Sequence, residues 1–129
     1  MQVGYPAAID RVDGDHVVVV RGLPEIVTAD ALEVVLGAKM DRGRDVPEPS
    51  APEPGEHLVP LPPLLGAKLA VYLTLRRSGL PTEELARRLG VDSRDVRDLL
   101  STTADTPLAL LARAAEALDA RLVIGLEPA

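Results

Sequence analysis

Residues 82–100 read TEELARRLGVDSRDVRDLL and predict two short helices joined by a sharp turn. The apolar stripes of these helices, at helical spacing, are formed by Leu85, Ala86, Leu89, Val96, Leu99 and Leu100. Gly90 ends the first helix and Val91 fills the turn from inside, while the small Ala86 lets the helices cross closely. This order of residue types is typical of a helix-turn-helix, whose second helix can lie in the major groove of DNA.

The residues that would contact DNA follow from this interpretation. Ser93, Arg94 and Arg97 belong to the start of the second helix and are expected to face the groove. Thr82 and Arg88 are expected to meet phosphates. An arginine that makes a bidentate contact to guanine contributes about 1–3 kcal/mol of discrimination between bases.

Three carboxylates also belong to this stretch and oppose the DNA-binding interpretation. Asp92 is predicted to cap the second helix, and Asp95 lies where a carboxylate faces the positive helix end. Together with Asp98 they bring negative charge towards a polyanion. A purely structural module with no DNA role is therefore the alternative.

Composition excludes several classes of function. The 129 residues contain no cysteine and only two histidines, His16 and His57, which are far apart in the chain. Disulfides, zinc knuckles and thiol catalysis are excluded, and no metal site or cofactor is expected. Aromatic residues make up 2% of the chain, so the core must be aliphatic and a base-stacking surface is not expected.

The acidic residues near Asp13-Gly14 are interpreted as part of a turn. Asp10, Asp13 and Asp15 could be imagined as a metal or nuclease site, but Asp-Gly is a strong hairpin signal. No catalytic residue is assigned, and the protein is not expected to be an enzyme. The chain has no apolar run of about 18 residues and no secretion signal, so we expect a cytoplasmic protein without a membrane partner.

Charge is distributed unevenly along the chain. Residues 1–61 contain five Lys/Arg and eleven Asp/Glu, a net charge of −6, whereas residues 62–129 contain nine of each. This asymmetry indicates two surfaces with different partners, although an acidic surface can also serve solubility alone.

Prolines divide the chain. Seven of the twelve fall in residues 47–63, and the stretch VPEPSAPEPG predicts an extended linker. We therefore predict an acidic sheet-and-helix domain at 1–45, a proline-rich linker at 46–60 with a candidate strand at 58–61, and a helix-turn-helix domain at 61–129.

The N-terminal domain is expected to be β-β-β-α, with the candidate strand as a further β element. Alternation at residues 3–9 and the β-branched run at 16–21 predict two strands of a hairpin, and 26–28 a brief third. A helix follows, capped by Thr28 or Asp30 and ended by Gly43. The fold class is thus α+β.

The C-terminal domain is expected to begin with a helix that starts at Pro63 and stops at Gly79. After the helix-turn-helix, Thr106 and Pro107 predict the N-cap and first turn of a helix that runs to about Leu118. A short closing strand with its apolar side chains on one face follows, formed by Leu122, Ile124 and Leu126. One strand is not stable alone, so these residues are expected to pair with a second copy in a homodimer.

The pattern as a whole resembles the HicB family of type II antitoxins. The resemblance is carried by Tyr5-Pro6-Ala7, Gly22-Leu23-Pro24, Val27-Thr28, the proline segment from Val46 to Ser50, Leu61-Pro62-Pro63, Lys68-Leu69-Ala70, residues 84–91 and residues 114–122. The segment between Thr28 and Pro47 is shorter than is usual in that family.

The resemblance implies a role. HicB-like proteins have a partial RNase H-like N-terminal domain without catalytic carboxylates, which masks a small basic mRNA-cleaving HicA toxin. Their C-terminal domain dimerises, binds double-stranded operator DNA and represses the operon. Toxin-binding residues are not assigned, and assembly of dimers into tetramers is left open. The alternative is a stand-alone helix-turn-helix repressor whose N-terminal domain binds another protein or a ligand.

Overall fold

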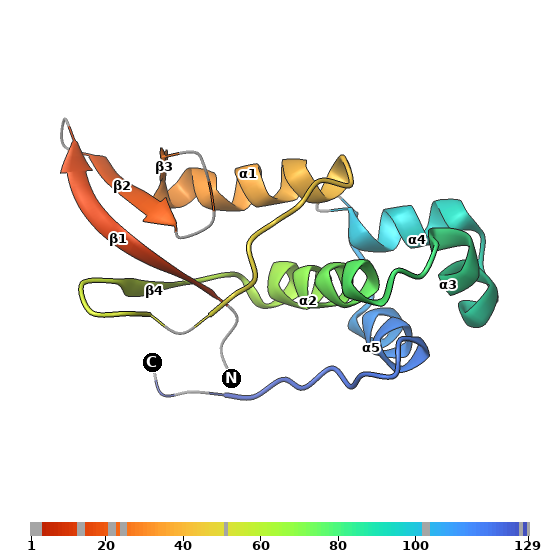
Figure 1. The fold of residues 1–129 in the computed structure, drawn as a ribbon. Coiled ribbons are helices and arrows are strands. Elements are labelled where there is room, and N and C mark those ends of the chain that lie inside the picture. Colours follow the sequence, from red (N-terminus) through yellow and green to blue (C-terminus); the bar gives the residue numbers. More distant parts are fainter. Residues whose placement is uncertain are drawn as a thin grey trace. The chain divides into compact units, whose positions relative to one another are not determined.

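The computed structural model describes residues 4–12, 15–20, 23, 26–50, 52–101, 104–126 and 128. In chain order the elements are β1 (Gly4–Val12), β2 (Asp15–Val20), β3 (Ile26–Thr28), α1 (Ala29–Asp41), β4 (His57–Pro60), α2 (Pro63–Ser78), α3 (Thr82–Leu89), α4 (Ser93–Leu100) and α5 (Leu108–Ala117) (Figure 1). The chain divides into an N-terminal unit, residues 2–63, and a C-terminal unit, residues 64–129.

The N-terminal unit is built on an antiparallel sheet with strand order β3-β2-β1-β4. Val12 of β1 pairs with Asp15 of β2, so two residues connect these strands. The connecting residues are Asp13 and Gly14, for which a turn was predicted, and they lie outside the described residues. Arg21, the last residue of the predicted second strand, also lies outside them. β4 returns after the proline-rich stretch to pair with β1, with Ala7 opposite His57.

Helix α1 lies against β2 and β3 (Figure 1). Leu32, Leu36 and Met40 are buried at a spacing of four residues, which places them on one face of the helix. The helix ends as Gly43 adopts a φ of +65°, a conformation that glycine reaches without a steric penalty.

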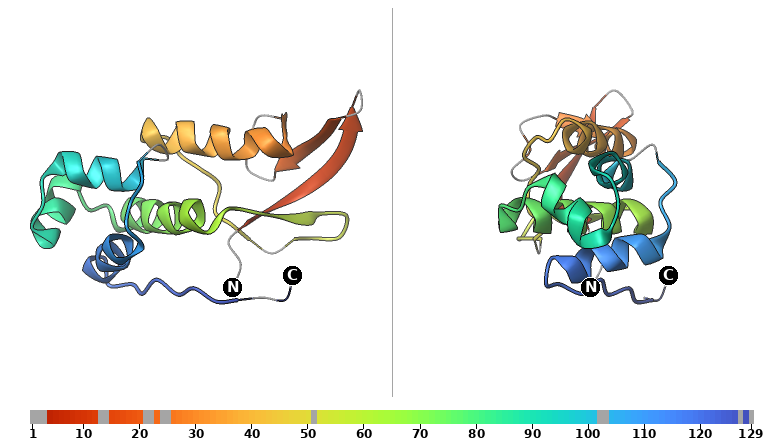
Figure 2. Two further views of the ribbon diagram at one scale, coloured as in Figure 1. Left: turned by 180° about the vertical axis from the view of Figure 1, so that it is seen from behind. Right: turned by 90° about the vertical axis from the view of Figure 1, so that its right-hand side faces the viewer.

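The C-terminal unit consists of α2 to α5 around an aliphatic core. The buried members of the core are Ala67, Val71, Leu75, Leu85, Ala86, Leu89, Val96, Leu99, Leu111, Ala114, Ala115 and Leu118. α3 contacts both α4 and α5, and Figure 2 shows these three short helices from two further sides. Because every helix contributes to the same core, each is stabilised mainly by its packing on the others.

The predicted closing strand is not formed. Residues 120–126 have neither helical nor strand structure, and the segment leaves α5 as an extended trace (Figure 2). Leu122 packs on the core of its own unit, whereas Val123, Ile124 and Leu126 are 73%, 56% and 101% exposed. The physical reason is that a strand needs a neighbour for its backbone N–H and C=O groups, and the described part of this chain places none beside it.

The start of α5 also differs from the prediction. Thr106 does not cap the helix, because its hydroxyl donates a hydrogen bond to the carbonyl oxygen of Leu99 at 3.3 Å. Pro107 occupies the cap position and α5 begins at Leu108. The Thr106 side chain therefore binds the C-terminal end of α4 and does not cap the start of α5.

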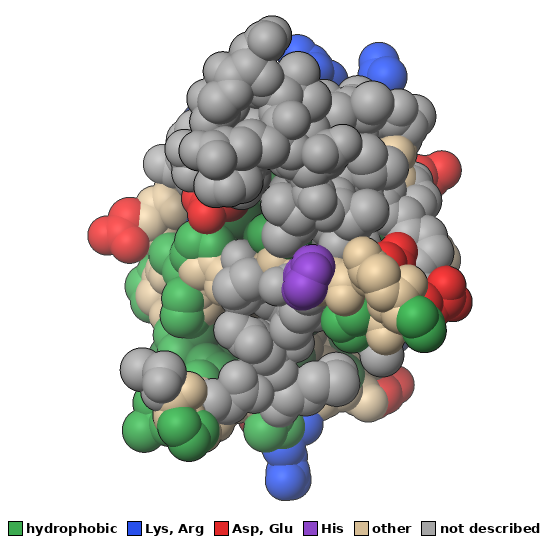
Figure 3. Space-filling model, turned by 90° about the vertical axis from the view of Figure 1, so that its left-hand side faces the viewer, with side chains coloured by type: hydrophobic (Ala, Val, Ile, Leu, Met, Phe, Trp, Pro, Cys, Tyr) green, Lys and Arg blue, Asp and Glu red, His purple; other side chains and the backbone are tan. Residues whose placement is uncertain are grey.

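The surface of the molecule carries both hydrophobic and acidic side chains. On the face drawn in Figure 3, hydrophobic side chains gather mostly along one side, with others at the lower edge and on the opposite side, and acidic side chains lie at both margins. Among the residues that the structure describes, no group of histidine and acidic side chains could hold a metal ion. Within the same residues, no helix has the length and the apolar character to cross a bilayer.

Candidate nucleic-acid interface

The turn between α3 and α4 is closed by backbone hydrogen bonds around Gly90. The amide of Val91 donates to the carbonyl oxygen of Ala86 at 3.0 Å, and the amide of Gly90 donates to that of Arg87 at 3.2 Å. Gly90 has φ +72° and ψ +33°, the left-handed conformation that this helix ending requires. The chain can therefore reverse within three residues and start α4 at Ser93.

The two helices are held together by buried aliphatic side chains. Leu85 and Val96 are fully buried, Ala86 is 3% exposed and Leu99 is 2% exposed. Val91 packs against the same core from the turn, as predicted. Burial of each large aliphatic side chain stabilises the packing by about 1.5–3 kcal/mol, so the relative orientation of α3 and α4 is well determined.

The start of α4 is fixed by its own acidic residues. Asp92 and Asp95 form a capping box, in which the Asp92 amide donates to Oδ2 of Asp95 at 3.2 Å. The capping role predicted for Asp92 is thus confirmed. Two of the three carboxylates that opposed DNA binding have a structural task at this helix end.

The far end of α4 is fixed by a lysine from α2. Lys68 is 1% exposed, and its Nζ donates to the carbonyl oxygens of Ser101 and Ala104, at 2.5 Å each. Ser101 is the C-cap of α4, where carbonyls lack a partner within the helix and carry partial negative charge, and Ala104 lies in the connection to α5. The buried ammonium group satisfies both carbonyls. Lys68 therefore anchors the C-terminal end of α4 to α2, a role that sequence reasoning did not assign.

The outward face of α4 carries the two arginines that the sequence singled out. Arg94 and Arg97 are exposed, on the side of the helix opposite the buried Val96 and Leu99. Within the described residues, neither guanidinium group has a hydrogen bond or an ion pair. Ser93 is half-buried at the first position of the helix. The predicted base-contacting residues thus lie on one short helix that is anchored at both ends.

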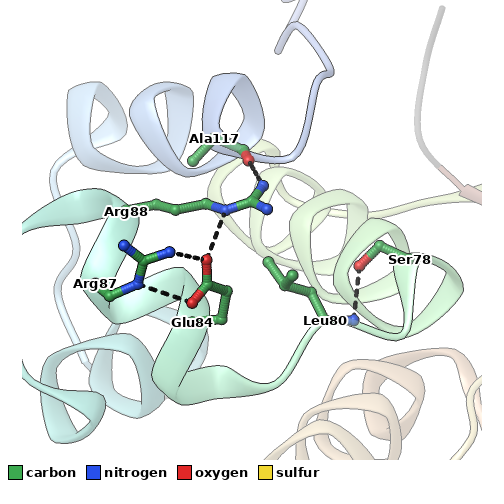
Figure 4. Close-up of polar contacts among 6 residues, drawn as sticks. All are labelled: Ser78, Leu80, Glu84, Arg87, Arg88 and Ala117. Carbon is green, nitrogen blue, oxygen red and sulfur yellow. Dashed lines mark hydrogen bonds and ion pairs between the residues drawn. The ribbon is translucent and has the colours of Figure 1, made fainter.

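Arg88, for which a phosphate contact was predicted, makes two hydrogen bonds within the C-terminal unit. Its Nη1 donates to the carbonyl oxygen of Ala117 at 2.8 Å, and its Nε donates to Oε1 of Glu84 at 3.4 Å (Figure 4). The guanidinium group therefore ties α3 to the C-terminal end of α5. Thr82, the other predicted phosphate contact, is the half-buried first residue of α3.

Glu84 joins both arginines of α3. Its carboxylate accepts hydrogen bonds from Arg87, one of them at 2.9 Å from Nε, and from Arg88 (Figure 4). The hydrogen bond from Arg87 lowers the pKa of Glu84 below the ordinary value for a glutamate, against an opposing effect of desolvation. The same contact raises the pKa of Arg87. These arginines are thus partly neutralised by their own helix.

A second arginine braces α3 and α5 in the reverse direction. Arg113 of α5 donates from Nη2 to the carbonyl oxygen of Leu89, the last residue of α3, at 3.1 Å. Arg88 and Arg113 therefore each satisfy a carbonyl at the C-terminal end of the other's helix. Charge pattern alone could not reveal this, because an arginine on a helix surface is ordinarily solvated.

Comparison with known proteins gives consistent matches. Residues 24–70, mostly in the N-terminal unit, match the family described as "HicB_like antitoxin of bacterial toxin-antitoxin system". The chain is 34% identical over 101 residues to Antitoxin HicB of Pseudomonas fluorescens, an alignment that covers 78% of this chain and 69% of that relative. It is 25% identical over 130 residues to Antitoxin HicB 2 of Photorhabdus laumondii, with 92% of each chain covered.

Proposed function

Since the chain belongs to the HicB-like antitoxin family, we propose that it is the antitoxin of a HicA/HicB-like pair. Its N-terminal unit masks a small basic mRNA-cleaving toxin. Its helices α3 and α4 act as a helix-turn-helix that binds operator DNA and represses the operon. The action is steric in both cases, and no residue of the chain performs catalysis.

The outward face of α4 carries the DNA-binding part of the proposal. Arg94 and Arg97 are exposed cations that have no hydrogen bond or ion pair with the described part of the chain, and they lie on a helix that is anchored at both ends. A rigid helix with exposed arginines near its start is what direct reading of guanine in the major groove needs. Nonspecific attraction is expected to be weak, because residues 62–129 have no net charge.

The test is a binding assay of the full chain on its own promoter. Replacing Arg94 and Arg97 together by alanine removes two contacts per protomer of about 1–3 kcal/mol each, so specific affinity is expected to fall at least about 30-fold. Arg77→Ala is the matched control, since Arg77 is exposed in the same unit but outside α4. Unchanged affinity of the double variant would remove this assignment of the DNA-contacting residues.

Charge supports the masking of a basic toxin. The net charge of −6 in residues 1–61 favours association with a positively charged partner and speeds their encounter. The test is co-purification of the full chain with the protein encoded beside it, followed by measurement of toxin activity. A chain that binds its promoter but no neighbouring gene product would instead be a stand-alone repressor.

We further propose that residues 121–126 form the dimer interface. Ile124 and Leu126 are exposed on an extended segment, and the equivalent segment of a second copy can supply the missing backbone partners. Ile124→Asp with Leu126→Asp should yield monomers in analytical ultracentrifugation, whereas Val123→Asp, on the alternate side of the segment, should yield dimers. A double variant that stays dimeric would place the interface elsewhere.

In such a dimer, the two α4 helices would read half-sites about 34 Å apart, one turn of DNA. Pairing of dimers into tetramers would be visible in the same sedimentation experiment as a species of twice the dimer mass.

A further inference from the structure

Asp98 is the carboxylate on α4 that the fold does not use. It is exposed in the last turn of the helix, and within the described residues its side chain has no hydrogen bond or ion pair. The capping box uses Asp92 and Asp95 instead. A carboxylate near the negative end of the helix dipole is locally unfavourable, so helix stability does not explain it.

The position of Asp98 is defined by its neighbours on the outward face. Arg94 precedes it by four residues and Arg97 by one, so all three side chains lie opposite the buried Val96 and Leu99. The Cβ atoms of residues four apart on a helix lie about 6 Å from each other. This separation is less than two base-pair steps, because each step rises about 3.4 Å. Arg94 and Asp98 can therefore reach neighbouring base pairs.

From this placement we infer that Asp98 determines specificity by accepting a hydrogen bond from cytosine. The inference rests on the proposed operator binding. Arginine donates to O6 and N7 of guanine, whereas a carboxylate accepts from the N4 amino group of cytosine. Arg94 and Asp98 together select a guanine and an adjacent cytosine in each half-site.

Such a residue has a double effect on binding. Its negative charge repels phosphate and lowers affinity for every DNA sequence, while its hydrogen bond favours one base. Removal of the carboxylate is therefore expected to raise affinity for unrelated DNA and to reduce discrimination among bases. A carboxylate that served only solubility would not influence discrimination.

The test compares the wild-type chain with Asp98→Ala by fluorescence anisotropy on the promoter of its own gene. In the promoter duplexes, each C·G pair of the half-site is replaced in turn by T·A. Wild type should lose about 5- to 150-fold in affinity at one such position, and Asp98→Ala less than about 2-fold there. On unrelated DNA the variant should bind at least as tightly as wild type.

Asp105→Ala is the matched control, because it removes one exposed carboxylate of the same unit outside α4. It should retain the discrimination of wild type. If wild type prefers its promoter and Asp98→Ala discriminates equally well at every position, this inference is overturned and operator binding stands. If wild type has no preference for its promoter, operator binding itself fails and the inference falls with it.

Discussion

Replacement of Lys68 by methionine tests whether the buried ammonium group anchors α4. Methionine keeps an unbranched stem of similar length, so the change removes the charged donor and leaves little empty volume. The carbonyl oxygens of Ser101 and Ala104 then lose their contacts of 2.5 Å with Nζ. Lys68 itself is 1% exposed, whereas Ser101 and Ala104 are half-buried, so water can replace the donor only in part.

The magnitude follows from these two acceptors. Each buried carbonyl that loses its hydrogen bond lowers the free energy of unfolding by about 1–3 kcal/mol. Part of this loss is offset, because the variant no longer buries a charged ammonium group. We expect the free energy of unfolding to fall by about 2–4 kcal/mol. With an m-value of about 2 kcal/mol/M in urea, the unfolding midpoint then falls by about 1–2 M.

The assay is urea unfolding of the full chain, monitored by circular dichroism. Arg77→Met is the control, since Arg77 is an exposed cation on the same helix and its replacement should change stability by less than about 0.5 kcal/mol. If Lys68→Met were as stable as wild type, the two carbonyls would not depend on the ammonium group. The reasoning about the end of α4 would then be refuted.

Three further predictions concern α3 and α5. Asp119 has a φ of +59°, so Asp119→Gly is expected to stabilise the protein by about 0.5–1 kcal/mol and to raise the thermal midpoint by a few degrees. Arg88→Met removes the donor to the Ala117 carbonyl and should lower the free energy of unfolding by about 1 kcal/mol. Arg87→Met, at a side chain that is 75% exposed, should lower it by less than about 0.5 kcal/mol, both measured by urea unfolding. The lowered pKa of Glu84 means that its ion pair stabilises the fold at neutral pH and ceases to do so as pH falls through that lowered pKa. The difference in stability between wild type and Glu84→Gln should therefore shrink on acidification.

Each of these has an outcome that would contradict it. A lower thermal midpoint for Asp119→Gly would mean that the aspartate side chain itself supports the helix end. Equal costs for the two arginine variants would show that the Ala117 contact is not the relevant one. A difference between wild type and Glu84→Gln that grows on acidification would reverse the sign of the linkage.

The local features of α3 and α4 could be predicted because their interactions lie within a few residues. Gly90 ends α3 through a bond between residues five apart, and Asp92 and Asp95 are three apart. The apolar spacing that predicted the core face likewise depends only on helical geometry, and Leu85, Val96 and Leu99 are buried.

Contacts between distant residues could not be predicted in the same way. Lys68 reaches Ser101 across 33 positions, Arg88 reaches Ala117 across 29, and Arg113 reaches Leu89 across 24. Only a hint existed for Lys68, as the sole charged residue between Pro63 and Arg76. The single chain does not form the predicted closing strand for a related reason, since a strand depends on a neighbour that its own residues do not specify.

The sequence by itself thus determined where α3 and α4 begin and end and which side chains face their common core. The tertiary structure decided what the charged side chains do. Arg88 was assigned to α5 and Lys68 to the end of α4, while Arg94 and Arg97 were left exposed. The physical reason is that helix formation and capping are short-range, whereas the partner of a long flexible cation depends on which backbone carbonyls packing brings within its reach.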